Sequence, residues 1–191
     1  MRVAWRRLVQ RLRQLRLVEE GTAAVEFALI LPIMLLVYIG SVEASALISM
    51  DRRVQSVAGT LGDLVARADT TISAAALTDY FRAAEGIMTP YPADGLRQVV
   101  TQVAVDDAGN ATVVWSRQYV DGEYGVGTER LLGDPYELAD AMDTIARGNF
   151  VIVAEATNSY LPMYGFVFEQ PIRLYRENFF VPRFGGSITV N

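Results

Sequence analysis

The sequence predicts an α+β protein in which a long, partly transmembrane N-terminal helix precedes a small antiparallel sheet domain. Three patterns predict it: an uncharged apolar run near the N-terminus, helical spacing of apolar residues beyond that run, and alternating strand patterns separated by turn clusters. A length of 191 residues provides for one compact domain beside such a helix. The expected segments are a basic leader at 1–21, a transmembrane helix at 22–48, a helix extension and linker at 49–69, and an α+β domain at 70–191.

The leader is defined by its charge. The first 21 residues hold six arginines and two acids, a net charge of +4, whereas the remaining residues hold 11 arginines and 20 acids, a net charge of −9. Arginine-rich segments beside a membrane span stay on the cytoplasmic side, so we expect the N-terminus inside and the C-terminal domain outside. The acidic body lacks the positive footprint of nucleic-acid-binding proteins, and no nucleic-acid partner is expected.

The membrane segment follows the leader directly. The sixteen residues from Phe27 to Val42 include no charge, and extending them back to Thr22 gives 21 positions whose only charge is Glu26. A helix of about 20 apolar residues crosses a bilayer core of about 30 Å. Pro32 is compatible with this interpretation, because membrane helices tolerate a proline that would break the interior of a soluble helix. We therefore expect one membrane span.

Two processing sites are present in this region. Ala44-Ser45-Ala46 has the A-x-A form of a secretory cleavage site, and cleavage there would release a body that begins at Leu47. The other site lies before the apolar run, at the bond between Gly21 and Thr22, where the basic leader ends. The sequence leaves both possibilities open.

Glu26 is the unusual residue of the membrane segment, because an ionisable group inside a span is costly and is a functional candidate. Cleavage after Gly21 would create a positive α-amine on Thr22, four residues before Glu26. Residues i and i+4 share a helix face, so this amine could neutralise its own Glu26 or that of a neighbouring helix. The alternative is that Glu26, close to the helix end, reaches the lipid headgroups.

Beyond the membrane segment, apolar residues at 3-4-3-4-3 spacing form a seam: Leu47, Met50, Val54, Val57, Leu61 and Leu64. This spacing predicts that the helix continues to about Arg67. Such a seam packs either on the protein's own sheet or on a partner helix, and both are possible at different heights. Gly59 and Gly62 are expected to weaken the helix end.

The body is predicted to have the element order α-β-β-α-β-β, with the helices on one face of an antiparallel sheet. Ser73 is a candidate cap for a helix that ends near Gly86. The stretch 121–133 is glycine-rich and polar and is expected to be an exposed loop. Pro135 and Gly148 frame a second helix. The strands are expected at 98–105, 111–120, 150–156 and 172–181, and the second helix at 136–147.

Composition excludes much catalytic chemistry. The chain has no cysteine and no histidine, and all 17 basic residues are arginine. These absences exclude disulfides, Cys/His zinc sites, thiolate or imidazole catalysis, and lysine Schiff bases. Asp106, Asp107 and Asn110 lack the spacing of a calcium loop and indicate a hairpin turn. We expect a protein that is not an enzyme, with no catalytic residues, cofactor or metal.

The N-terminal motif resembles a known signal. Gly21, followed by Glu26-Phe27 ahead of a long apolar run, resembles the class 3 signal of prepilins, which a dedicated membrane aspartyl peptidase cuts. The block from Ala23 to Pro32, with Gly40-Ser41-Val42-Glu43, resembles TadE/TadG-like minor pseudopilins of tight-adherence (Tad) pilus systems. Further similar stretches are Asp51–Val54, Leu61–Val65, Val153–Glu155, Tyr160–Pro162 and Phe180–Arg183.

The resemblance implies a pilin-like fold and a minor pilus subunit, cleaved after Gly21 and assembled through its N-terminal helix for adherence. Its implied partners are the membrane, a prepilin peptidase, other pilus subunits and the assembly platform. The protein would be a single-pass inner-membrane protein with a periplasmic domain. The resemblance also allows its incorporation into the extracellular pilus. The implied cleavage residues are Gly21 and Thr22, and the implied assembly residues are Glu26, Phe27, Pro32 and Glu43.

Two other functions remain open. One is a membrane-anchored periplasmic binding module, and the other is a secreted domain released after Ala46. Glu43 departs from the family pattern, because Ala44-Ser45-Ala46 follows it where relatives often have an arginine. A Glu–Arg pairing is therefore not carried over to this chain.

Overall fold

The computed structural model describes residues 20–139, 142, 145–163, 165 and 170–191. The chain divides into two compact units, the first ending at Ala44 and the second running from Ser45 to Asn191. A single helix, α2 (Glu20–Ala66), supplies the described part of the first unit and the beginning of the second. The predicted long helix is confirmed, and it ends one residue before the expected Arg67.

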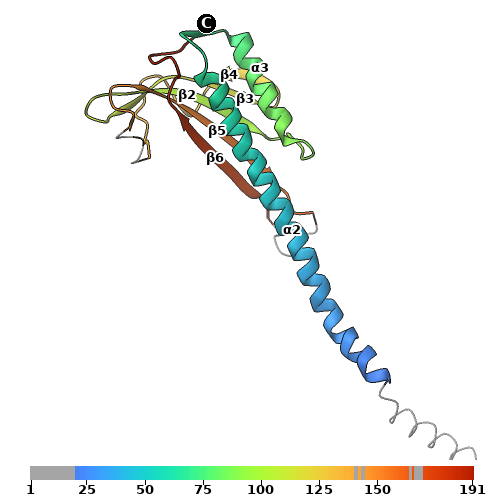
Figure 1. The fold of residues 1–191 in the computed structure, drawn as a ribbon. Helices are drawn as coiled ribbons and strands as arrows, with labels where there is room; N and C mark the ends of the chain where they lie inside the picture. Colours follow the sequence, from blue (N-terminus) through green and yellow to red (C-terminus); the bar gives the residue numbers. More distant parts are fainter. Residues whose placement is uncertain (1–19, 140–141, 143–144, 164, 166–169) are drawn as a thin grey trace, which may run out of the picture. The chain divides into compact units, whose positions relative to one another are not determined.

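The second unit contains a five-stranded sheet in the order β4-β3-β2-β5-β6, antiparallel throughout (Figure 1). Its strands are β2 (Arg97–Val105), β3 (Ala111–Val120), β4 (Glu123–Val126), β5 (Phe150–Tyr160) and β6 (Ile172–Phe180). A smaller parallel pair joins β1 (Thr71–Ile72) to β7 (Thr189–Val190). The α+β class with a long N-terminal helix is as predicted.

One face of the sheet is covered by two helices, residues 45–66 of α2 and the whole of α3 (Ala74–Glu85) (Figure 1). Of the two body helices that the sequence predicts on one face, α3 is the one found here. The seam packs here on the protein's own sheet. Met50, Val54, Val57 and Leu61 are buried, and at the end of the helix Val65 is buried while Leu64 is only half-buried. The alternative of a partner helix is therefore wrong for this stretch.

The connection into α3 follows the predicted capping chemistry. The Ser73 side chain accepts a hydrogen bond of 3.1 Å from the backbone N–H of Ala76, which satisfies a donor that the helix leaves free. After α3 a short 3-10 turn, η1 (Gly86–Met88), leads toward β2. In the predicted hairpin turn, Asp106 accepts two hydrogen bonds of 2.8 Å from Asn110, and β2 and β3 flank it.

Three expectations for the body are wrong. The stretch 121–133 is not only a loop, because β4 pairs with β3 there, and β5 continues to Tyr160 rather than ending at residue 156. Within the helix expected at 136–147, Met142 and Ile145 are helical, but the helix does not begin at Tyr136. Its backbone N–H donates instead to the carbonyl of Ala111 over 2.9 Å, and the preceding proline forms a bridge with Thr112. Residues 140–141 and 143–144 lie outside the described residues.

Gly62 determines how closely α2 approaches the sheet. A Cβ atom at this position would lie 2.3 Å from the Phe180 ring and 3.0 Å from the Cβ atom of Ala154. The predicted weakening of the helix is thus only part of the role of this glycine, because a side chain here would push the helix off β5 and β6.

Candidate functional site

Apart from Glu43, the predicted cleavage and assembly residues of the N-terminal motif lie in the first four turns of α2. Gly21 and Thr22 are helical, and Glu26 and Phe27 follow one turn later, all exposed. Thr22 and Glu26 are four residues apart on one continuous helix, so they share a face, as the proposed pairing of amine and carboxylate requires. Pro32 lies inside the helix.

The same stretch presents apolar side chains on every side. The described residues include one helix, at Gly21–Ala66, that is long and apolar enough to cross a membrane, and nothing in its most apolar window is buried. The Ser41 hydroxyl is satisfied within the helix, because it donates a hydrogen bond to the Val37 carbonyl over 2.7 Å. Exposed large side chains include Phe27, Leu29, Ile30, Ile33, Leu35, Leu36 and Tyr38. Such a surface needs lipid or protein around it.

Glu43 differs from the other predicted assembly residues. Its exposed fraction is 1%, whereas Glu26 and Phe27 are exposed. At 1.5 Å per residue it lies about 26 Å along the helix from Glu26. The structure therefore does not bring the two carboxylates into one site.

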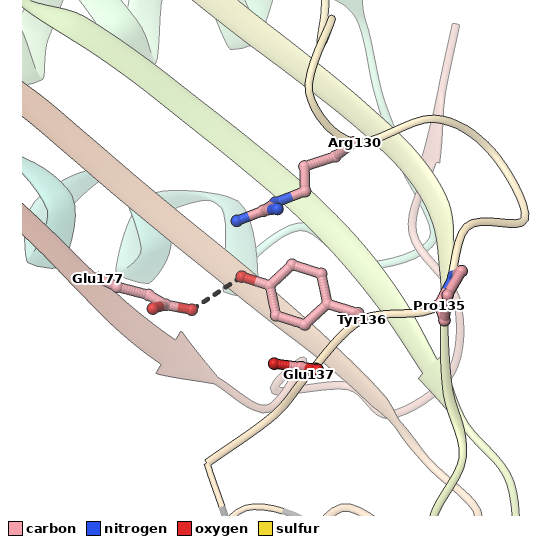
Figure 2. Close-up of a pocket in the computed structure, with 5 residues that line it drawn as sticks. All are labelled: Arg130, Pro135, Tyr136, Glu137 and Glu177. Carbon is pink, nitrogen blue, oxygen red and sulfur yellow. Dashed lines mark hydrogen bonds between the residues drawn. The ribbon is translucent and has the colours of Figure 1, made fainter.

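Sequence reasoning missed a polar cluster on the sheet face opposite α2. Glu155 on β5, 7% exposed, accepts a hydrogen bond of 3.1 Å from Arg130 and one of 2.7 Å from the Tyr175 hydroxyl. Glu177 on β6 accepts a hydrogen bond of 2.8 Å from the Tyr136 hydroxyl, and the Arg130 guanidinium lies 4.9 Å from the centre of the Tyr136 ring (Figure 2). Side chains from two strands and one loop thus form one network.

Burial and the neighbouring carboxylates raise the pKa of both tyrosine phenols of this network. Burial and the neighbouring Glu155 carboxylate raise the pKa of the Tyr136 phenol above its usual range. Burial and the hydrogen bond to Glu155 do the same to the pKa of the Tyr175 phenol. Both phenols therefore remain protonated and act as hydrogen-bond donors at any physiological pH.

A hollow of about 440 Å³ opens beside this network. It is lined by Arg130, Pro135, Tyr136, Glu137 and Glu177 (Figure 2). Among the described residues no group of three potential metal ligands is present. The Glu155 and Glu177 carboxylates are already engaged by Arg130 and the two tyrosines, so the arrangement holds the loop with Arg130 and Tyr136 against the sheet. No sequence signal could have found it, because Arg130 belongs to a stretch with the composition of a loop.

The motif stretches at 51–54, 61–65 and 180–183 lie where α2 contacts β6 and the residues that follow it. Asp51 on α2 pairs with Arg176 on β6, and Asp63 pairs with Arg183. The backbone N–H of Arg183 also donates to the Ala66 carbonyl over 2.9 Å. These contacts, with the packing of Gly62 on Phe180, fix the helix to β6. The stretches at 51–54, 61–65 and 180–183 thus share a structural role.

Comparison with known families gives one match. Residues 21–60 match the family model described as TadE-like protein. This segment covers the predicted cleavage residues, the apolar stretch and the first part of the seam. The comparisons found no matching curated protein and no matching solved structure.

Proposed function

We propose that this chain, which is TadE-like over residues 21–60, is a minor pilus subunit that is cleaved after Gly21 and assembled through its N-terminal helix in a Tad-type pilus. The TadE-like family indicates a Tad pilus-associated protein, generally structural rather than catalytic. The match to a segment that includes both the cleavage motif and the exposed apolar helix is the observation on which the proposal depends. The helix crosses the inner membrane with its N-terminus in the cytoplasm, as the arginine-rich leader favours.

Lateral helix packing explains how such a subunit would assemble. The apolar side chains of residues 22–42 first lie in lipid, and an assembling pilus replaces lipid with neighbouring helices. Cleavage would give Thr22 a positive amine on the helix face that Glu26 occupies. In a medium of low dielectric constant, pairing this amine with the Glu26 of a neighbour favours one register over others.

The first test is the N-terminus of the mature protein, determined by sequencing and intact-mass analysis of purified envelopes. We expect it at Thr22. An intact Met1 in every molecule would contradict the proposal and favour a tethered binding module. Leu47 as the first residue would favour a secreted domain. Against that outcome, Ala46 and Leu47 are both helical and both pack on the core of the second unit, so the bond between them is not extended.

The second test is Glu26→Ala. We expect cleavage to remain largely intact, because the bond at Gly21–Thr22 is unchanged, and pilus assembly to fall, because the amine loses its partner. The matched control is Glu123→Ala, which removes an exposed carboxylate from β4 and the same unit of charge. Cleavage is read by mass spectrometry and assembly by the yield of sheared pili. Unchanged assembly in Glu26→Ala would remove Glu26 from the mechanism.

A further inference from the structure

Within the second unit, α2 and β6 run side by side in the same direction. Asp51 contacts Arg176, and four residues later the Gln55 amide donates to Asn178 over 2.9 Å. Farther along, Gly62 faces Phe180. The contacts advance together along both elements, so the beginning of β6 lies beside the beginning of this part of the helix.

The position of the start of β6 along α2 follows from the rise per residue of a strand and of a helix. From Arg176 back to Ile172 a strand spans about 13 Å at about 3.3 Å per residue. From Asp51 back to Ser45 a helix spans about 9 Å at 1.5 Å per residue. Ile172 pairs with Tyr160, the last residue of β5. The end of β5 therefore lies at, or slightly beyond, the level at which the chain enters this unit.

Large apolar side chains are exposed at this end. Immediately after β5, Leu161 is 73% exposed and Met163 is 77% exposed. Ile48 on α2 is also exposed. The residues Tyr160–Met163 have no charge, whereas the body as a whole is acidic. Other large apolar side chains, among them Leu131, Leu132 and Phe184, are exposed elsewhere in this unit, so exposure alone does not distinguish this end. What distinguishes Leu161 and Met163 is that they lie at the end where the chain enters the unit.

We propose that Leu161 and Met163 insert into the interfacial layer of the same membrane that the N-terminal helix crosses, as a second membrane contact. This inference rests on the proposed membrane span. Ser45 follows Val42, the last residue of the uncharged run, by only three residues in one continuous helix. The covalent chain thus holds this end of the second unit at the membrane surface, and apolar side chains there partition into the boundary between headgroups and acyl chains. Lipid is the chosen occupant because the lipid-facing stretch of the helix continues directly to this end.

The chain offers a matched control residue at the other end of the sheet. Leu132 is 79% exposed, close to Leu161 in chemistry and exposure. The next residue, Gly133, donates its backbone N–H to Val113 over 2.8 Å. Val113 pairs with Val103, which pairs in turn with Val151 at the start of β5. Leu132 thus belongs to the sheet end away from Tyr160 and should remain in water.

The experiment uses single cysteines in the full-length chain, which has none of its own. The variants Leu161→Cys, Met163→Cys, Leu132→Cys and Leu35→Cys are each labelled with an environment-sensitive fluorophore and reconstituted into phosphatidylcholine vesicles. Quenching is then measured with lipids that bear a spin label near the headgroup for the labels at 161, 163 and 132, and with lipids that bear it near the end of the acyl chain for the label at 35. We expect the labels at 161 and 163 to be quenched at least about twofold more strongly than the label at 132. The label at 35 reports the membrane span.

The outcomes separate the inference from the proposed function. Quenching at 35 with labels at 161 and 163 that behave like the label at 132 would overturn the second contact and leave the membrane span in place. Loss of quenching at 35 would overturn both. A blue shift at 161 that depends on the ratio of protein to lipid, without lipid quenching, would indicate contact between subunits and would also overturn the inference.

Discussion

The two halves of α2 have the same backbone and opposite surfaces. From Gly21 to Tyr38 every residue is exposed and most are apolar, whereas from Met50 to Val65 a single stripe is buried and the opposite side is polar. A helix that is apolar on all sides needs an apolar surrounding, and one with a single apolar stripe packs on a domain. The comparison shows that one helix is built for two environments.

The positions of ionisable groups support this division. The first half has Glu26 as its acidic residue between Thr22 and Val42. In the second half Asp51 and Asp63 each pair with an arginine that follows β5 in the chain. Charges therefore fasten the second half to its own domain, and they are nearly absent from the first.

The largest expected effect on the second half comes from Leu61→Ala. Leu61 is fully buried in the core cluster, and truncation of such a residue costs about 2–5 kcal/mol of unfolding free energy. The matched control on the same helix is Leu29→Ala, whose side chain is 71% exposed. Denaturant unfolding of the full chain in detergent should show a large loss for the first variant and no change for the second. Equal losses would contradict the division of the helix.

The reciprocal change is Leu35→Arg in the first half. An arginine near the centre of a membrane helix raises the free energy of insertion by about 2.5–3.5 kcal/mol. Leu35→Ile is the control that keeps the side chain apolar. Membrane fractionation after alkaline extraction should show loss of integration for the arginine variant alone, with the fold of the second unit unchanged by circular dichroism. Full integration of the arginine variant would mean that this stretch does not span the bilayer.

The elements predicted correctly are those whose signals are local. The seam of α2 and the Ser73 cap depend on neighbours within one or two turns, so periodicity and capping chemistry reveal them. The alternation around the Asp106–Asn110 turn likewise predicts β2 and β3. The N-terminal motif could be found for the same reason, because Gly21 and Glu26 are close in the chain.

The features that sequence missed depend on contacts between distant residues. Pro135 has the usual position of a helix start, but the backbone after it pairs with the beginning of β3, and the Tyr136 ring lies under Arg130. The contact of Arg130 with Glu155 joins a loop to a strand 25 residues away in the chain. Local propensity contains no information about such pairings, which tertiary packing decides.

Two glycines of α2, Gly62 and Gly59, test how closely the helix approaches the sheet. At Gly62 a Cβ atom would overlap the Phe180 ring, so Gly62→Ala should cost about 1–3 kcal/mol of unfolding free energy. At Gly59 the nearest atom, Nδ2 of Asn178, is 3.8 Å away, so Gly59→Ala should stabilise the helix by about 0.5–1 kcal/mol. Thermal unfolding of both variants tests the pair. If both alanines stabilise, the approach of the helix to β6 is looser than described.

The smallest effect is expected at Asp63, where the helix end pairs with Arg67 and Arg183. The hydrogen bond from Arg67 is the main reason that the pKa of Asp63 lies below its ordinary value of 3.8. Since the folded state lowers this pKa, the unfolded state binds more protons, so the pairing stabilises the fold above about pH 4 and is lost as the pH falls through the folded pKa.

Because these side chains are partly exposed, Asp63→Asn should cost less than about 1 kcal/mol at pH 7, and it should flatten the loss of stability below about pH 4. Asp69→Asn is the control, an exposed carboxylate for which the described part of the chain shows no ion pair. Urea unfolding between pH 3 and pH 7 measures both effects, and a variant that keeps the full acid slope would place the titrating group elsewhere, for example at Asp106 or Glu129, whose pKa values are also lowered. The test thus shows whether the ion pairs of Asp63 contribute to holding the end of α2 on the domain, or whether packing alone holds it.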